Sequence, residues 1–135
     1  MRSISFALLM LTGCSSGEER SDLRSGTFAA AGRDRLCIAD EAQSRRAGLI
    51  VYGAGDGNCS ASGRLERGAA GWILVPRGEG NCRISLLTTG DGYSIGKVTA
   101  ACDYYCGLGA SFTGQRFERE ATIGNVTDLA GDPFC

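Results

Sequence analysis

Short apolar segments alternate with glycine-rich turns along most of this chain. From Cys59 to Glu66, small or apolar residues at odd positions alternate with polar residues at even positions, which is the period of a strand with one buried face. Apolar runs at 49–52 and 72–75, alternations at 84–86 and 93–95, and weaker segments at 27–28 and 36–38 add six strands. The pattern therefore predicts an all-β fold with little helix: a small antiparallel meander of about seven strands, forming a barrel or curled sheet.

A turn motif occurs twice. The segment Gly-Asp-Gly-Asn-Cys from Gly55 to Cys59 is followed 23 residues later by Gly-Glu-Gly-Asn-Cys from Gly78 to Cys82. Each copy follows an apolar strand and precedes an alternating one, so we expect both loops and both cysteines at the same end of the sheet. Asp56 and Glu79 would make that end acidic and attract a basic partner; alternatively, they only keep the loops soluble.

The chain changes character after residue 100. Residues 100–105 are expected to form a helical turn that stops at Gly107. This turn contains Tyr104 and Tyr105, which would either form a recognition surface or pack beneath the end of the barrel. The tail from Thr127 to Cys135 is expected to form a short helix.

Cysteine and histidine content narrows the possible chemistry. The 135 residues include seven cysteines and no histidine, so Ser-His-Asp and Cys-His catalysis are excluded, as are histidine-ligated metals. An even set of six cysteines predicts three disulfides in an exported domain, with all fifteen pairings open; the six are Cys37, Cys59, Cys82, Cys102, Cys106 and Cys135. We expect no catalysis, cofactor or metal, although a hydrolase that uses carboxylates such as Asp91 and Asp103 remains an alternative. A formal net charge of −1 does not suggest a nucleic-acid partner.

The first fourteen residues have the pattern of a sorting signal. Arg2 precedes an apolar run at 4–11, which ends in the segment Leu11-Thr12-Gly13-Cys14. This segment resembles a bacterial lipobox, although an ordinary signal peptide with a chance cysteine is the alternative. The resemblance implies a lipoprotein in which Cys14 carries fatty acyl chains such as palmitate and becomes the first mature residue. It divides the chain into a signal peptide (1–13), a flexible tether (14–25) and a single β domain (26–135).

The same resemblance predicts where the protein is located. In such lipoproteins a serine after the acylated cysteine, here Ser15, permits export to the outer membrane. We therefore expect a protein of the cell envelope that is anchored by lipid and faces the periplasm.

Two further resemblances concern the mature domain. The segments 51–56, 104–107 and 128–133 are similar to small lipoproteins of Gram-negative bacteria, a resemblance that implies no activity. The segment 60–64, followed by Trp72 and by Arg77-Gly78, is similar to the Ser-Gly motif region of membrane-bound inhibitors of C-type lysozyme. That second resemblance implies that Ser62 and Arg77 enter the lysozyme cleft. Arg77 replaces the lysine of that motif, and Leu65 replaces its tyrosine.

These observations predict a lipid-anchored envelope protein that is a non-catalytic binding or structural module. Its membrane contact would be the N-terminal lipid, and a second envelope protein is a possible partner. The alternative is a periplasmic inhibitor of C-type lysozyme.

Overall fold

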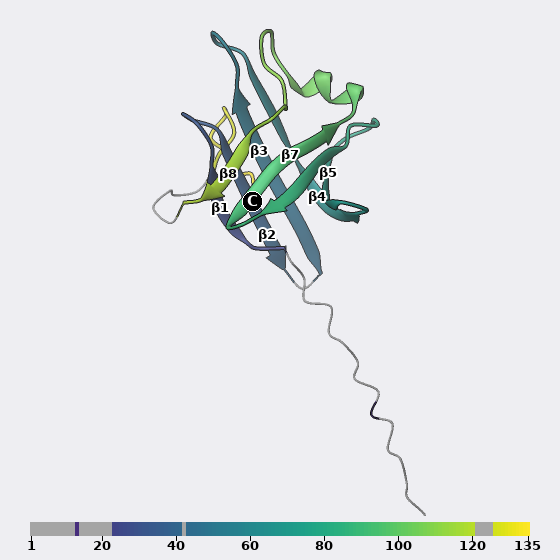
Figure 1. Ribbon diagram of the computed structural model, residues 1–135. Helices are drawn as coiled ribbons and strands as arrows, with labels where there is room; N and C mark the ends of the chain where they lie inside the picture. Colours follow the sequence, from purple (N-terminus) through teal and green to yellow (C-terminus); the bar gives the residue numbers. More distant parts are fainter. Residues whose placement is uncertain (1–12, 14–22, 42, 121–125) are drawn as a thin grey trace, which may run out of the picture.

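The computed structural model describes residues 13, 23–41, 43–120 and 126–135. The predicted lipid-attachment residue Cys14, nearly all of the signal peptide and most of the tether lie outside these residues. The described residues form eight antiparallel strands, each paired with its neighbours in sequence, and the last strand pairs with the first to close a barrel (Figure 1). The elements are β1 (Gly26–Ala29), β2 (Arg35–Glu41), β3 (Ser44–Tyr52), β4 (Asn58–Gly68), β5 (Gly71–Pro76), β6 (Ile84–Thr89), β7 (Gly92–Val98), the 3-10 helix η1 (Ala100–Tyr105) and β8 (Arg116–Arg119).

The sequence pattern predicts seven of these strands and misses β8. This strand has four residues, of which only Phe117 is apolar, so it shows no hydrophobic run. It closes the barrel by pairing with β7 through Tyr93 and Ser94 and with β1 through Phe28 and Ala29. Its strand conformation therefore depends on partners that are distant in sequence.

Large apolar side chains fill the barrel interior. An eight-stranded barrel is just wide enough for its interior to be filled in this way. The alternation in β4 is confirmed, because Cys59, Ala61 and Leu65 are buried while Arg64 and Glu66 are exposed. The bulkiest fully buried side chains are Trp72, Tyr93, Phe28, Phe112, Phe117, Leu36, Leu49, Leu74, Ile84 and Leu86.

The C-terminal segment, residues 126–135, packs outside the barrel. Phe134 and Val126 cover Ile50 of β3 and Cys37 of β2, and a disulfide joins Cys37 to Cys135. This cover explains why the run 49–52 is continuously apolar, since its strand is buried on both faces. Gly48 permits the contact, because a Cβ there would lie 2.1 Å from the Cβ of Phe134.

The predicted helix in this segment is wrong. The Asp128 carboxylate accepts hydrogen bonds from the backbone N–H groups of Ala130 and Asp132, each at 2.9 Å. Gly131 has a φ of 89°, and Thr127 pairs with Pro133 as an isolated bridge. A turn that satisfies its own backbone through an aspartate side chain competes with the helix and replaces it.

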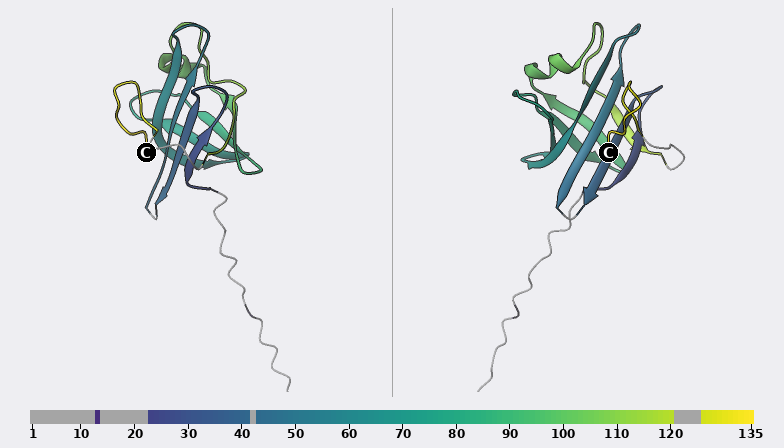
Figure 2. Two further views of the ribbon diagram at one scale, coloured as in Figure 1. Left: turned by 90° about the vertical axis from the view of Figure 1, so that its left-hand side faces the viewer. Right: turned by 180° about the vertical axis from the view of Figure 1, so that it is seen from behind.

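The two ends of the barrel differ, and we name them by the segments they contain. The distal end comprises the loops 30–34, 53–57 and 77–83, together with η1 and the loop 106–115. The tether end comprises residues 23–25 and the turns β2–β3, β4–β5 and β6–β7. Figures 1 and 2 show η1 at one end and the start of β1 at the other. Among the described residues, no helix has the length and apolar character needed to cross a membrane.

Residues 23–25 belong structurally to the barrel, although the sequence assigns them to the tether. Leu23 is only 6% exposed and packs in the main core. The backbone N–H of Arg24 donates to the Tyr93 hydroxyl at 2.7 Å, and that hydroxyl donates to the Arg24 carbonyl at 3.1 Å. The described chain therefore enters the barrel beside the β6–β7 turn.

Candidate functional site

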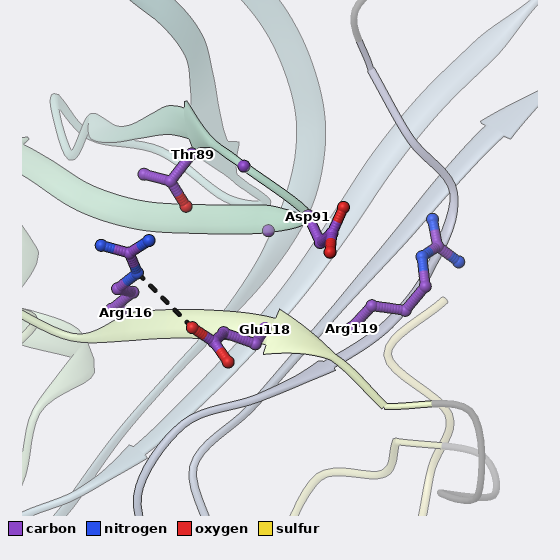
Figure 3. Close-up of a pocket in the computed structure, with 7 residues that line it drawn as sticks. Thr89, Asp91, Arg116, Glu118 and Arg119 are labelled. Carbon is purple, nitrogen blue, oxygen red and sulfur yellow. Dashed lines mark ion pairs between the residues drawn. The ribbon is translucent and has the colours of Figure 1, made fainter.

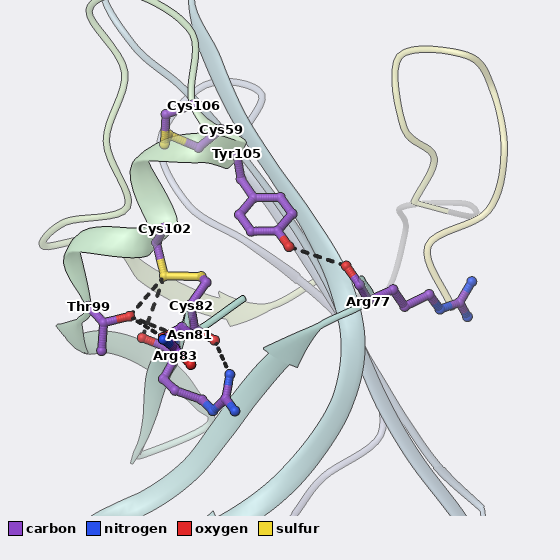
Figure 4. Close-up of a disulfide and its surroundings, with 9 residues drawn as sticks. All are labelled: Cys59, Arg77, Asn81, Cys82, Arg83, Thr99, Cys102, Tyr105 and Cys106. Carbon is purple, nitrogen blue, oxygen red and sulfur yellow. Dashed lines mark hydrogen bonds between the residues drawn. A yellow bond between two sulfur atoms is a disulfide. The ribbon is translucent and has the colours of Figure 1, made fainter. Parts of the chain in front are cut away.

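Two disulfides hold η1 against the distal end of the barrel. Cys59 of β4 bonds to Cys106, and Cys82 in the β5–β6 loop bonds to Cys102 (Figure 4). The cysteines of the repeated motif therefore lie at one end of the sheet, as predicted. One of them is bonded to Cys102 within η1 and the other to Cys106 directly after it. With Cys37–Cys135, these bonds account for all six cysteines of the predicted framework.

Hydrogen bonds reinforce these covalent links. The Thr99 hydroxyl donates to the carbonyl of Asn81 and accepts from the backbone N–H of Arg83, both at 2.9 Å. The Tyr105 hydroxyl donates to the carbonyl of Arg77 at 3.2 Å (Figure 4). The first residue before η1 and the last residue within it are thus both bonded to the β5–β6 loop.

The β3–β4 loop packs backbone to backbone against the loop after η1. A Cβ on Gly53 would lie 2.1 Å from the Gly109 carbonyl oxygen, and one on Gly57 would lie 2.0 Å from the Leu108 carbonyl oxygen. The backbone N–H of Gly107 also donates to the Asn58 carbonyl at 2.8 Å. Only glycine allows so close an approach, so this loop composition positions the surface around Leu108.

This rigid framework displays two large apolar side chains to solvent. Tyr104 is 87% exposed and Leu108 is 96% exposed, whereas the neighbouring Tyr105 is partly buried and packs edge-on to Tyr104 with ring centroids 5.2 Å apart. A groove of about 590 Å³ lies beside them, lined by residues 56–58 and 104–108. We call Tyr104, Leu108 and this groove the distal surface.

The charges at the distal end have both signs. Asp103 and the predicted acids Asp56 and Glu79 are exposed there. Cationic side chains occupy the same loops and strand ends, namely Arg33, Arg77 and Arg83. The apolar pair therefore distinguishes this surface more clearly than its acidity does.

The structure brings some predicted site residues together and separates others. Asp56, Tyr104 and Tyr105 line one groove, whereas Glu79 lies in the β5–β6 loop and is not among the described residues of that lining. Ser62 and Arg77 are neighbours across β4 and β5, since the Arg77 N–H donates to the Ser62 carbonyl at 2.9 Å.

Sequence reasoning missed Leu108. Its signal was a large apolar residue between Gly107 and Gly109, a context in which no strand face is available to bury the side chain.

The carboxylates of the hydrolase alternative do not converge. Asp91 lies in the β6–β7 turn at the tether end, and Asp103 lies in η1 at the distal end. Within the described ranges, no group of three or more His, Cys, Asp or Glu side chains is arranged to hold a metal ion.

Comparisons with known proteins give no family for this chain. No protein-family model, curated protein or solved structure matches it.

Proposed function

We propose that this protein is a lipid-anchored binding module of the cell envelope and that its distal surface contacts a protein partner. The observation that carries the proposal is the exposure of Tyr104 and Leu108 on loops fixed by two disulfides. Exposed apolar side chains on a rigid surface lose little conformational entropy on binding, and tyrosine is enriched in protein interfaces. Asp56 at the groove edge supplies a polar contact beside them.

The place where the described chain enters the barrel supports the same proposal. The described chain enters the barrel at the tether end, and Arg24 is hydrogen-bonded to the β6–β7 turn there. Acylation of Cys14 would place this end toward the membrane, with the distal surface pointing away from it. The resemblance of residues 11–14 to a lipobox, followed by Ser15, favours the outer membrane.

Site-specific photocrosslinking in cells tests the proposed surface. A photoreactive phenylalanine analogue at position 104 should give a discrete adduct, which Leu108→Ser should weaken. The matched control is position 129, because Leu129 is also apolar and 68% exposed but lies in the C-terminal segment. Equal crosslinking from both positions, or from neither, would contradict the proposal.

The lipid anchor needs a separate test. The Cys14→Ala variant should leave an unprocessed precursor without lipid, and release of correctly sized protein without lipid would contradict anchoring.

A second candidate, an inhibitor of C-type lysozyme, rests on the adjacency of Ser62 and Arg77. Ser62 lies in β4 and Arg77 directly follows β5, and their backbones are paired. The two residues are therefore adjacent, as entry into one cleft would require. Purified protein should then inhibit the enzyme, and Arg77→Ala should raise the inhibition constant while Arg116→Ala, on β8, should not. Inhibition that is insensitive to Arg77→Ala, or no inhibition, would exclude this candidate.

A further inference from the structure

A pocket at the tether end is lined by charges of both signs. It has a volume of about 520 Å³ and lies between the β6–β7 turn and β8 (Figure 3). Arg116 and Arg119 contribute the positive charges, and Asp91 and Glu118 contribute the negative charges. In Figure 3 the Asp91 carboxylate lies between the Arg119 guanidinium and the Arg116–Glu118 ion pair, whose Nε–Oε1 distance is 3.7 Å.

The turn that lines this pocket also holds the first described residues of the domain. The Arg24 guanidinium donates to the carbonyls of Thr89, Gly90 and Gly92, and all three residues line the pocket. Nine residue steps separate Cys14 from Leu23, so this part of the chain spans at most about 30 Å. If Cys14 is acylated, the pocket lies within reach of the membrane surface.

The lining matches a zwitterion better than a simple anion. Arginine forks bind phosphate oxygens in pairs, and Asp91 and Glu118 can accept hydrogen bonds from a primary ammonium group. Gly90 lacks a side chain and a Cβ there would meet no atom within 4 Å, so a ligand can approach the backbone of the turn at this residue.

We propose that this pocket binds the phosphoethanolamine headgroup of a membrane phospholipid, with Arg116 and Arg119 on the phosphate and Asp91 and Glu118 on the ammonium. This proposal rests on the proposed lipid anchor, because exposed ion pairs of this kind are individually weak. A short linker raises the local ligand concentration to about the millimolar range. The anchored protein would therefore use a weak site to fix its orientation, with the distal surface facing away from the membrane.

Binding can be measured without the anchor. The chain from residue 14 onward with Cys14→Ser keeps residues 23–135 and can be mixed with vesicles of phosphatidylcholine alone or with added phosphatidylethanolamine. Phosphatidylcholine carries the same phosphate, but its ammonium is fully methylated and cannot donate to carboxylates. We expect about tenfold stronger sedimentation with phosphatidylethanolamine, the effect of one charge-assisted hydrogen bond. Amide NMR shifts should centre on 89–92 and 116–119.

Matched variants and soluble probes separate the explanations. Arg116→Gln and Asp91→Asn should each remove the preference for phosphatidylethanolamine, whereas Arg64→Gln should not, because Arg64–Glu66 is a similar exposed pair on β4. Free phosphoethanolamine should shift the same amides more than inorganic phosphate does. Equal binding to both vesicle types, equal shifts with phosphate, or an effect of Arg64→Gln would overturn the proposal. The tested chain carries no lipid, so these measurements report on headgroup binding alone. Whether the wild-type protein is anchored by lipid is measured separately, by fractionating cells that express it.

Discussion

Residues 23–25 should contribute strongly to the stability of the barrel. A chain that starts at Gly26 loses the burial of Leu23, which is 6% exposed and worth about 1.5–3 kcal/mol. It also loses the two hydrogen bonds between the Tyr93 hydroxyl and the Arg24 backbone, each worth about 0.5–1.5 kcal/mol. We therefore expect the free energy of unfolding to fall by about 3–5 kcal/mol relative to the Cys14→Ser chain that starts at residue 14.

Urea unfolding under oxidising conditions measures this difference. With a slope of about 1–3 kcal/mol per molar urea, the midpoint of the shorter chain should be lower by about 2 M. Tyr93→Phe supplies the internal control. It should destabilise the longer chain by about 1–3 kcal/mol and the shorter chain less, since the two hydrogen bonds to the Arg24 backbone are already absent there. Coincident unfolding curves for the two chains, or equal effects of Tyr93→Phe in both, would refute the reasoning.

Three further changes test the packing around the candidate site and the C-terminal segment. Tyr105→Phe removes the hydrogen bond from η1 to the β5–β6 loop and should lower the free energy of unfolding by about 0.5–1.5 kcal/mol, measured in urea. Gly48→Ala introduces a Cβ that overlaps Phe134; it should cost about 1–3 kcal/mol and speed amide exchange in residues 126–134. Replacing Cys82 and Cys102 together by serine removes a disulfide between residues 20 positions apart. The unfolded chain then gains conformational entropy, so the free energy of unfolding should fall by about 3 kcal/mol, measured by thermal unfolding.

Each of these changes has an outcome that would count against it. An unchanged urea midpoint for Tyr105→Phe would mean that its hydroxyl bond contributes nothing to stability. Adding Phe134→Gly should relieve Gly48→Ala, because it removes the overlapping Cβ; no relief would show that the clash is elsewhere. For the cysteine pair, loss of cooperative unfolding rather than a lower midpoint would mean that this bond is required for the distal end to fold.

The parts of the fold that were predictable are those encoded by local periodicity. The alternation from Cys59 to Glu66 and the repeated Gly-x-Gly-Asn-Cys turn each carry their information within about ten residues, so strand faces and loop placement followed directly. The repeat also implied that Cys59 and Cys82 share one end of the sheet, which the two disulfides to η1 confirm.

The parts that were not predictable depend on distant partners. The strand β8 exists because β1 and β7 present open edges to it, and its own residues carry no strand signal. The disulfide pairing depends on which loops meet at the distal end, a property of the closed barrel. The place of Leu108 on the surface likewise follows from the glycine contacts of its loop with residues 53–57; the flanking Gly107 and Gly109 indicate a loop but not the loop against which it packs.

The way each end of the barrel is closed supports placing the two proposed contacts at opposite ends. At the distal end, two disulfides and the buried Phe112 close the core, so apolar side chains can be displayed there without losing order. At the tether end, guanidinium groups lie over core aromatic rings at 4.8–5.9 Å from the ring centroids; they belong to Arg24, Arg45, Arg67 and Arg119. Such groups cover apolar surface while keeping their charge near solvent. The charged cover of the tether end therefore suits contact with a layer of lipid headgroups, and the exposed apolar side chains of the distal end suit contact with a protein partner.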